Sequence, residues 1–424
     1  MVSNISGTLQ SARPGPGAAA AIRVVMLDLL SMVPYYTGHL SAGLRGAEGV
    51  QVTLASITYR HDPQFFRRQG LSNDPGLLDL TSRLRRAPEA VRLALKMLEY
   101  LVNLGALLIR FVVSRPDLIH VQFLPLAGYG FPVERWFLRL VRMLGIKVVY
   151  TVHNLLPQDS GERYRASYRR TYELADRLIC HDAQTATRLA REFAVMPERI
   201  QTIPHGPLFE QEAGAPVEQA RARLGFAADQ CVVLWQGILR PYKGISFLLQ
   251  AWSQVCVNDP RSRLAIVGTG DSDLVQAVEH EVSSLGVESR VRLELRFVPV
   301  QELADFYQAA DILVYPYSEI TTSGALMTGI LRGKAIIASA LPAFEQILRH
   351  GETGLLVRYG DIDALASSLL RLIRDPGFRR GLCERLCESQ ARAPRWADIA
   401  RRTCECYRAA ISDQARWSGQ PVRT

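Results

Sequence analysis

The sequence predicts an α/β protein with two doubly wound, Rossmann-like domains in tandem. Two series of short aliphatic or β-branched runs follow one another along the chain, and helical stretches separate the runs. This alternation is typical of parallel sheets with crossover helices. The chain has 424 residues, 48% of them hydrophobic, which is enough for two or three cores of ordinary size.

The first series spans residues 22–208. We expect one strand in each of its six runs, which are IRVVMLDLL, VQVTLASI, DLIHVQF, KVVYTVHN, RLICHD and RIQTIPHG. Residues 1–21 are rich in Gly, Ala, Ser and Pro and lack the basic start and apolar core of a signal peptide. We therefore expect a disordered tail before the first domain.

The second domain is expected over residues 209–385, and its series of strands starts after an acidic connection, PLFEQEAGAPVEQA. Its runs are QCVVLWQG, SRLAIVG, VRLEL, DILVYP, KAIIAS and GLLV. The same alternation predicts a second parallel sheet. Residues 386–424 are rich in Arg and are expected to be helical.

The basic charge is confined to the first half of the chain. Residues 1–200 hold 25 Lys and Arg against 16 Asp and Glu, whereas residues 201–424 hold 25 of each kind. Residues 81–115 begin with basic side chains and end in an apolar helix, so we expect an anionic membrane or acceptor to meet Arg83, Arg85, Arg86, Arg92 and Lys96. The alternative is that Leu93, Leu98, Leu101 and Leu108 pack onto the sheet while the arginines are solvated.

Metals, dinucleotide cofactors and disulfides are not expected. The seven cysteines show neither CxxC pairs nor a metal-ligand spacing. The glycines Gly268 and Gly270 lack the third glycine of the dinucleotide fingerprint. The longest apolar stretch, from Tyr100, is interrupted by Asn103 and Arg110 and is too short to span a bilayer. A cytoplasmic protein, free or peripheral on the inner face of the membrane, fits this composition.

Two stretches of the second domain are suited to phosphate. In LWQGILRPYKGISFLLQAW, Gly237 ends a predicted strand and Lys243 precedes a helix, so a flexible ammonium lies where open α/β sheets bind ligands. In SEITTSGALMTGILRGKAII, the small residues Thr321 to Gly324 precede a helix whose first amides lack partners and favour an anion. The alternative for Thr322 and Ser323 is that they only cap the helix.

Taken together, these stretches resemble glycosyltransferase family 4 (group 1). The resemblance rests on GILRPYKGISFLLQAW, IVGTGD, FVPVQELADFYQAADILVYPYS, SGALMTGILRGKAIIAS and HGETGLLVRYGDIDAL, and more diffusely on TVHNLLPQD, ADRLICHD and IPHG. It implies the GT-B fold, in which two Rossmann-like domains face each other across a cleft. The second domain would bind a nucleotide sugar, UDP- or GDP-linked, and the first would bind the acceptor. Residues 386–424 would cross back to the first domain.

The resemblance also assigns residues. Lys243 matches the lysine that meets the donor diphosphate, with Gly237, Gly268, Thr322, Ser323 and Gly324 around it. The family's arginine after the first glycine is here Ile238, and Arg240 is the nearby substitute. His153 matches a histidine near the transferred sugar. The two family glutamates are replaced by Ile320 and Thr328, which leaves Glu319 as the neighbouring carboxylate and Thr328 as a neutral contact to the nucleoside.

The implied activity is transfer of a sugar to a lipid-linked or saccharide acceptor in polysaccharide or glycoconjugate synthesis, with retention and without a metal. Because the glutamate pair is missing, two alternatives stay open: an inverting enzyme with Asp159 or His153 as base, and an inactive sugar-nucleotide-binding subunit. A nucleic-acid binder is suggested only by charge and lacks a recognition module.

Overall fold

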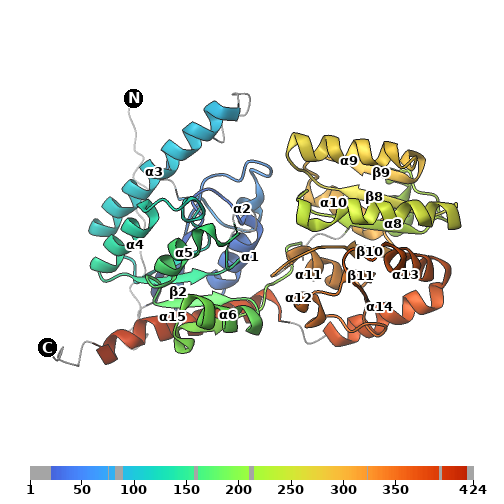
Figure 1. The fold of residues 1–424 in the computed structure, drawn as a ribbon. Helices are drawn as coiled ribbons and strands as arrows, with labels where there is room; N and C mark the ends of the chain where they lie inside the picture. Colours follow the sequence, from blue (N-terminus) through green and yellow to red (C-terminus); the bar gives the residue numbers. More distant parts are fainter. Residues whose placement is uncertain are drawn as a thin grey trace, which may run out of the picture.

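The computed structural model describes residues 21–74, 76–81, 89–156, 161–209, 214–321, 323–390 and 394–417. They form two α/β domains, each built on a six-stranded parallel sheet, which confirms the predicted fold class (Figure 1). Each of the twelve predicted runs contains one strand. Except for its last residue, Ala21, the predicted tail lies outside the described residues. The same holds for Arg83, Arg85, Arg86, Asp159 and Thr322.

The first sheet has the strand order β2-β1-β3-β4-β5-β6. Its strands are β1 (Ile22–Leu27), β2 (Val50–Ala55), β3 (Leu118–Val121), β4 (Lys147–Thr151), β5 (Arg177–Cys180) and β6 (Ile200–Thr202). The helices of this domain are α1 (Pro34–Arg45), α2 (Phe65–Arg68), α3 (Glu89–Val113), α4 (Val133–Met143), α5 (Arg165–Tyr172) and α6 (Ala183–Phe193). One core lies between the sheet and α3, α4 and α5, and another lies between the opposite face and α1.

The second sheet has the order β12-β11-β10-β7-β8-β9. Its strands are β7 (Val232–Gln236), β8 (Arg263–Val267), β9 (Val291–Glu294), β10 (Ile312–Tyr315), β11 (Ala335–Ser339) and β12 (Leu355–Val357). Its helices are α7 (Val217–Leu224), α8 (Ile245–Asn258), α9 (Ser272–Ser284), α10 (Val300–Ala309), α11 (Gly324–Leu331), α12 (Pro342–Glu345), α13 (Ile362–Arg374) and α14 (Pro376–Gln390). The order reverses between β7 and β10, and open sheets of this kind bind ligands at that switch point.

The last helix, α15 (Trp396–Trp417), returns to the first domain (Figure 1). Its residues Ile399 and Tyr407 join the core beneath α1, and the indole of Trp396 donates a hydrogen bond to the carbonyl of Pro207 at 2.9 Å. The predicted boundary at residue 385 falls inside α14. Leu386, one residue beyond this boundary, still packs in the core of the second domain. Helix α14 therefore belongs to the second domain and α15 to the first.

Helix α3 packs onto the sheet through side chains other than the four leucines considered in the sequence analysis. Tyr100, Leu104, Leu107 and Phe111 face the core, since they share one side of the helix. Leu93, Leu98 and Leu101 are exposed, so the expectation that they pack onto the sheet is wrong; only Leu108 packs partly. Within the described residues, none of the helices has the length and apolarity needed to cross a bilayer.

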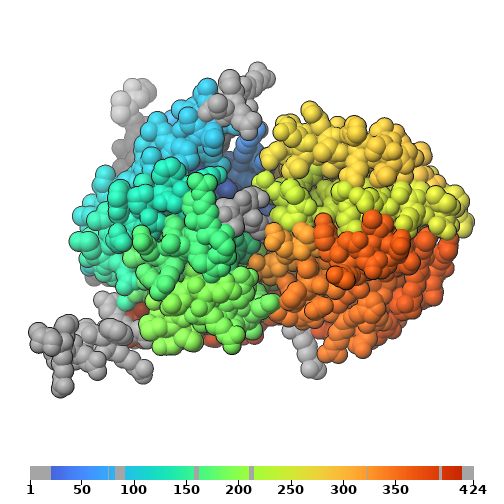
Figure 2. Space-filling view, viewed as in Figure 1, coloured from blue at the N-terminus to red at the C-terminus, as the bar shows by residue number. Residues whose placement is uncertain are grey.

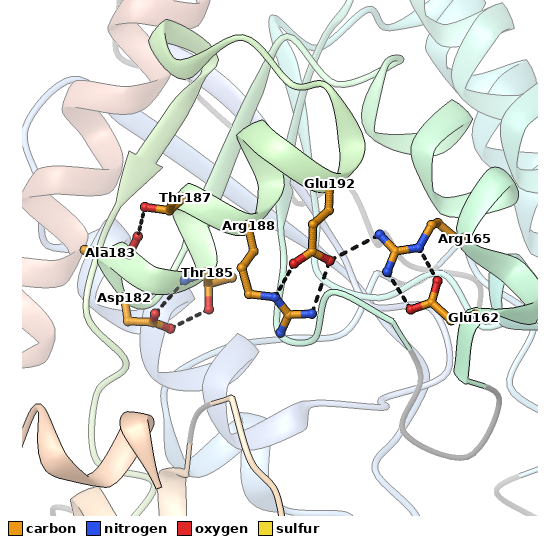
Figure 3. Close-up of polar contacts among 8 residues, drawn as sticks. All are labelled: Glu162, Arg165, Asp182, Ala183, Thr185, Thr187, Arg188 and Glu192. Atoms are coloured by element: carbon orange, nitrogen blue, oxygen red, sulfur yellow. Dashed lines mark hydrogen bonds and ion pairs between the residues drawn. The ribbon is translucent and has the colours of Figure 1, made fainter.

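Helix α6 begins at a side-chain cap and is tied to its neighbour by charges (Figure 3). The carboxylate of Asp182 accepts hydrogen bonds from the amide of Thr185 at 2.7 Å and from its hydroxyl at 2.6 Å. The carboxylate of Glu192 then links Arg188 on its own helix to Arg165 at the start of α5. The cap fixes where α6 begins after β5, and it thereby positions His181, which lies between the end of β5 and the cap residue.

Candidate active site

Two adjoining cavities lie where the domains face each other. In Figure 2 the first domain, blue to green, lies directly against the second, yellow to orange. A cavity of about 270 Å³ lies on the second-domain side, and one of about 570 Å³ lies on the first-domain side. Tyr35, Tyr59, His61, Leu208 and Ile238 line both cavities, so the two form a continuous cleft.

The smaller cavity gathers five of the predicted donor residues. Gly237 follows β7, Gly268 follows β8, Lys243 precedes α8, and Ser323 and Gly324 begin α11. All of these elements meet at the carboxyl edge of the second sheet, at its switch point. A Cβ on Gly268 would collide with the carbonyl oxygen of Gly237, so a glycine at this position lets the two loops touch.

Lys243 brings an unpaired cation to this cavity. Its ammonium lies 5.6 Å from the ring centre of Tyr317 and 6.0 Å from that of Trp235. Among the described residues, no carboxylate or carbonyl pairs with it. Burial, and secondarily the charge of Arg240, lowers the pKa of Lys243 to about 8. A desolvated cation without a partner is suited to an anionic ligand.

The start of α11 offers backbone donors beside this ammonium. The hydroxyl of Ser323 accepts from the amide of Leu326 at 3.1 Å and so caps the helix. Gly324 and Ala325 line the cavity, and within the described part of the chain their amides have no acceptor. Ser323 is therefore a cap, and the two amides after it remain available to an anion.

Three predicted residues do not reach the cavity. Arg240 lies 3.4 Å from Asp271 in an exposed ion pair. Glu319 is exposed, while the next residue, Ile320, lines the cavity. Thr328 is fully buried: its hydroxyl donates to the carbonyl of Gly324 at 2.9 Å and accepts from the amide of Leu208 at 3.1 Å. Its place one turn into α11 directs the hydroxyl to the helix's own backbone and the interdomain linker, away from a ligand.

The larger cavity is basic and lies in the first domain. Arg60, Arg92 and Lys96 line it, and none of the three has an ion-pair or hydrogen-bond partner among the described residues. Burial lowers the pKa of Lys96, against the opposing effect of Asp28. The predicted residues Arg92 and Lys96 therefore face the cleft, at the N-terminal end of α3.

His153 also lines the larger cavity, directly after β4. Its Nε2 lies 3.2 Å from the side-chain oxygen of Gln122, and its Nδ1 lies 3.2 Å from Nε2 of His181. Burial, with the neighbouring histidines, lowers the pKa of His153 well below its usual value. The imidazole is therefore neutral at neutral pH.

Comparisons with known proteins agree with this arrangement. The family model "Glycosyltransferase Family 4" matches residues 33–207, and "Glycosyl transferases group 1" matches residues 230–375. D-inositol 3-phosphate glycosyltransferase 1 from Catenulispora acidiphila is 30% identical over 290 residues, which cover 64% of this chain and 69% of the relative. The chain belongs to glycosyltransferase family 4. The relative from Thermobispora bispora, D-inositol 3-phosphate glycosyltransferase, is 28% identical over 316 residues, or 70% of this chain and 72% of the relative.

Solved structures give the fold of this glycosyltransferase. Sucrose-phosphate synthase from Thermosynechococcus elongatus has a TM-score of 0.72 at 23% identity, covering 92% of this chain and 100% of that one. HepE from Anabaena, in complex with UDP-glucose, has a TM-score of 0.71 at 16% identity with the same coverage. The GT-B fold expected from the resemblance is therefore confirmed.

The first-domain wall of the transferase's cleft was missed by sequence reasoning. Tyr35, Tyr59 and His61 line both cavities, and Arg60 lines the larger one. Their positions in the sequence were an available signal, because Tyr35 lies in the first turn of α1, which follows β1, and Tyr59 lies in the loop that follows β2. His181 and His205 lie at the ends of the predicted strand runs RLICHD and RIQTIPHG, a pattern that predicts strands but no role for the imidazoles.

Proposed function

We propose that this glycosyltransferase takes its sugar from a nucleotide-diphosphate sugar bound mainly to the second domain and transfers it to an acceptor in the larger cavity. The observation that carries this proposal is the unpaired ammonium of Lys243 beside the open amides of α11. The complexes of HepE with UDP and with UDP-glucose support a uridine nucleotide. A GDP-sugar is the second donor to test.

The proposed chemistry is electrostatic. When the bond from the anomeric carbon to the diphosphate breaks, negative charge grows on the leaving oxygen, and Lys243 with the amides of Gly324 and Ala325 would stabilise it without a metal. Among the described residues no carboxylate lines either cavity. This favours retention, in which the leaving phosphate itself takes the acceptor's proton. In the inverting alternative, His153, which lines the acceptor cavity, would act as the base. The anomeric configuration of the product distinguishes the two mechanisms.

Turnover tests the proposal. The purified chain would be incubated with UDP- and GDP-sugars, with and without a lipid extract and phosphorylated saccharides, and release of the nucleoside diphosphate would be measured. We expect release that depends on both one donor and one acceptor. Donor binding without any acceptor-dependent release would support the inactive subunit instead.

Donor affinity should depend on pH through Lys243. Its pKa of about 8 in the folded protein, against an ordinary 10.5, means that about half of the free enzyme has lost this charge at pH 8 and most of it has lost the charge one pH unit higher. A bound diphosphate favours the charged form, so affinity should be highest below pH 8 and fall by up to about tenfold per pH unit above it. Titrating the protein with a UDP-sugar, whose phosphates keep a constant charge in this range, measures the effect.

The matched control for this pH dependence is Lys243→Arg, because the guanidinium stays charged. Its donor affinity should be flat between pH 7 and 9.5. An equally steep fall in both proteins would mean that another group is responsible.

The lowered pKa of Lys243 also affects the stability of the unliganded wild type. Between about pH 8 and pH 10.5 its free energy of unfolding should increase as the pH rises, since the unfolded chain holds the proton that the folded chain has lost.

The acceptor is proposed to carry a phosphate. Arg60, Arg92 and Lys96 form an unpaired basic wall on the acceptor side of the cleft. The names of two relatives, D-inositol 3-phosphate glycosyltransferases, specify a phosphorylated acceptor, which supports the same chemistry here. A saccharide phosphate and a lipid-linked phosphate share this group, and the acceptor panel above distinguishes them.

Removing this basic wall should weaken acceptor binding selectively. Arg92→Ala and Lys96→Ala are each expected to raise KM for a phosphorylated acceptor by about 10- to 100-fold, because a charge-assisted hydrogen bond contributes roughly 1.5–3 kcal/mol. The donor Kd should change less than about twofold. Arg169→Ala removes an exposed arginine of α5 that lines neither cavity, and it serves as the control. An unchanged acceptor KM in both variants would exclude this wall as the phosphate site.

Attachment to an anionic membrane is proposed through the outer side of α3 and α4. These helices lie side by side at the end of the first domain away from the second (Figure 1). They expose apolar side chains, namely Leu98, Leu101, Val102, Ile109, Val112, Val113, Trp136, Leu140 and Met143. Arg135, Arg139 and Arg142 flank them on α4. An apolar face bordered by arginines suits the surface of an anionic bilayer.

Liposome flotation tests this surface. Trp136→Ser is expected to reduce recovery with anionic vesicles several-fold, because a large side chain leaves the bilayer interface. Val257→Ser, an exposed apolar position on α8, should leave recovery unchanged. Equal recovery of the wild type with neutral and anionic vesicles at low salt would remove the electrostatic part of the proposal.

A further inference from the structure

Three histidines converge at the carboxyl edge of the first sheet. His153 follows β4, His181 follows β5, and His205 lies three residues beyond β6, so each comes from one of three adjacent strands. One ring nitrogen from each lies within 4.8 Å of the others, a grouping found for no other set of potential ligands among the described residues. The ring of Tyr36 packs against all three, with centroid distances of 4.8, 5.2 and 5.0 Å.

The outer hydrogen bonds fix two of the tautomers. Nδ1 of His181 lies 3.1 Å from the carbonyl oxygen of Ile203, and Nδ1 of His205 lies 2.6 Å from that of Gly206. A carbonyl oxygen only accepts, so both Nδ1 atoms carry the proton. In the neutral ring this leaves Nε2 of each with a free lone pair.

The third tautomer follows from Gln122. Its amide nitrogen lies 3.0 Å from the sulfur of Met26, which can only accept, so its amide oxygen faces Nε2 of His153 at 3.2 Å. Nε2 of His153 therefore donates, and its Nδ1 has the free lone pair. This nitrogen lies 3.2 Å from Nε2 of His181, whose lone pair is also free, so neither atom brings a proton to the contact. Two facing lone pairs repel each other unless a cation lies between them.

The surroundings of the three rings also disfavour their charged form. Burial lowers the pKa of His181 to about 4 and that of His205 to about 3, and burial together with the neighbouring rings lowers that of His153 well below its usual value. The neutral imidazole is the form that binds metals.

We propose that His153, His181 and His205 bind a divalent transition-metal ion, with zinc as the best match. Zinc binds neutral imidazole nitrogens at about 2.0–2.1 Å, which places tetrahedral ligand nitrogens about 3.4 Å apart. The His153–His181 pair already has nearly this spacing. Metal-binding histidines also donate their other N–H to a carbonyl or amide oxygen, as all three do here. Mg²⁺ and Ca²⁺ prefer oxygen ligands, so a site formed by three imidazole nitrogens does not suit them.

The fourth ligand of this three-histidine site would come from the larger cavity. His153 and His205 line that cavity, whereas His181 lines neither cavity. Water or an oxygen of the acceptor can reach the ion from this side. Lys243 is not part of this site, although Cε1 of His205 lies close to Gly324 at the start of α11. Ion binding by the three imidazoles does not require the transfer reaction, so the site can hold an ion even if the proposed function is wrong.

The experiment is a metal titration of the full chain, without an affinity tag and after treatment with EDTA. Co²⁺ would be added and followed by its visible absorption, and Zn²⁺ would be added and followed by calorimetry. We expect one ion per chain and the intense bands of four-coordinate Co²⁺. His181→Asn keeps a donor for the carbonyl of Ile203 but lacks Nε2, so its affinity should fall by at least about 100-fold. His280→Ala removes an exposed histidine of α9 and should match the wild type.

Two results would overturn the proposal. One is that the wild type fails to bind Zn²⁺ or Co²⁺ stoichiometrically, which needs no variant. The other is that His181→Asn, with a circular dichroism spectrum like that of the wild type, binds the ion equally well. If His181→Asn does not fold, His205→Asn replaces it, because this change keeps a donor for the carbonyl of Gly206 in the same way.

Discussion

Lys243→Ala should fold normally and lose most of its activity. The unpaired ammonium contributes no ion pair to the fold, so the free energy of unfolding should change by no more than about 0.5 kcal/mol, or rise. Donor affinity should fall about 10- to 100-fold, because a charge-assisted contact to phosphate contributes roughly 1.5–3 kcal/mol. Loss of a cation that stabilises the leaving diphosphate should lower kcat by a further ~10²-fold or more.

Lys334→Ala is the matched control for this prediction. Lys334 is also a partly buried lysine of the second domain, but its ammonium donates to the carbonyl of Gln308 at 3.1 Å and lies outside the cavity. It should keep wild-type donor affinity and kcat. Normal donor kinetics in a folded Lys243→Ala variant would mean that this loop does not contact the donor.

Gly324→Val should abolish transfer at a moderate cost to the fold. A Cβ at this position would approach Leu208 at 2.6 Å and Cε1 of His205 at 3.1 Å, so the valine forces the interdomain linker to shift and covers the free amides of α11. Crowding of this kind costs about 1–3 kcal/mol of stability. Loss of backbone donors to the leaving group should reduce kcat by ~10²-fold or more. Thermal unfolding and transfer kinetics measure the two effects separately.

Gly105→Val makes the same change in α3, where a Cβ would meet nothing within 4 Å. It should leave transfer unchanged. If Gly324→Val folds and transfers sugar at the wild-type rate, the anion does not bind at this helix, and the match of this stretch to the family is wrong.

The strands and the donor glycines could be predicted because their signals are local. A buried parallel strand is a short aliphatic run, and Gly237, Gly268 and Gly324 directly follow or begin such elements. Thr328 and Glu319 could not be placed in this way. Glu319 is exposed whereas the very next residue, Ile320, lines the cavity. The direction of the Thr328 hydroxyl depends on where α11 meets the linker at Leu208.

The partners of charged and imidazole side chains depend on tertiary structure. Arg240 is near Lys243 in sequence, yet it pairs with Asp271 from the neighbouring loop. His181 and His205 lie in runs that predict strands, but their meeting with His153 requires β4, β5 and β6 to be adjacent in that order. Strand order is a property of the whole sheet and is not encoded in a single run.

Calorimetric titration of the wild type and Lys243→Ala with UDP and GDP at pH 7 tests the central claim most directly. We predict that the wild type binds one of the two nucleotides at one site per chain, and that the variant binds it about 10- to 100-fold more weakly. Absence of binding of either nucleotide to the wild type, or equal affinity in both proteins, would contradict a donor diphosphate site formed by Lys243 and the start of α11.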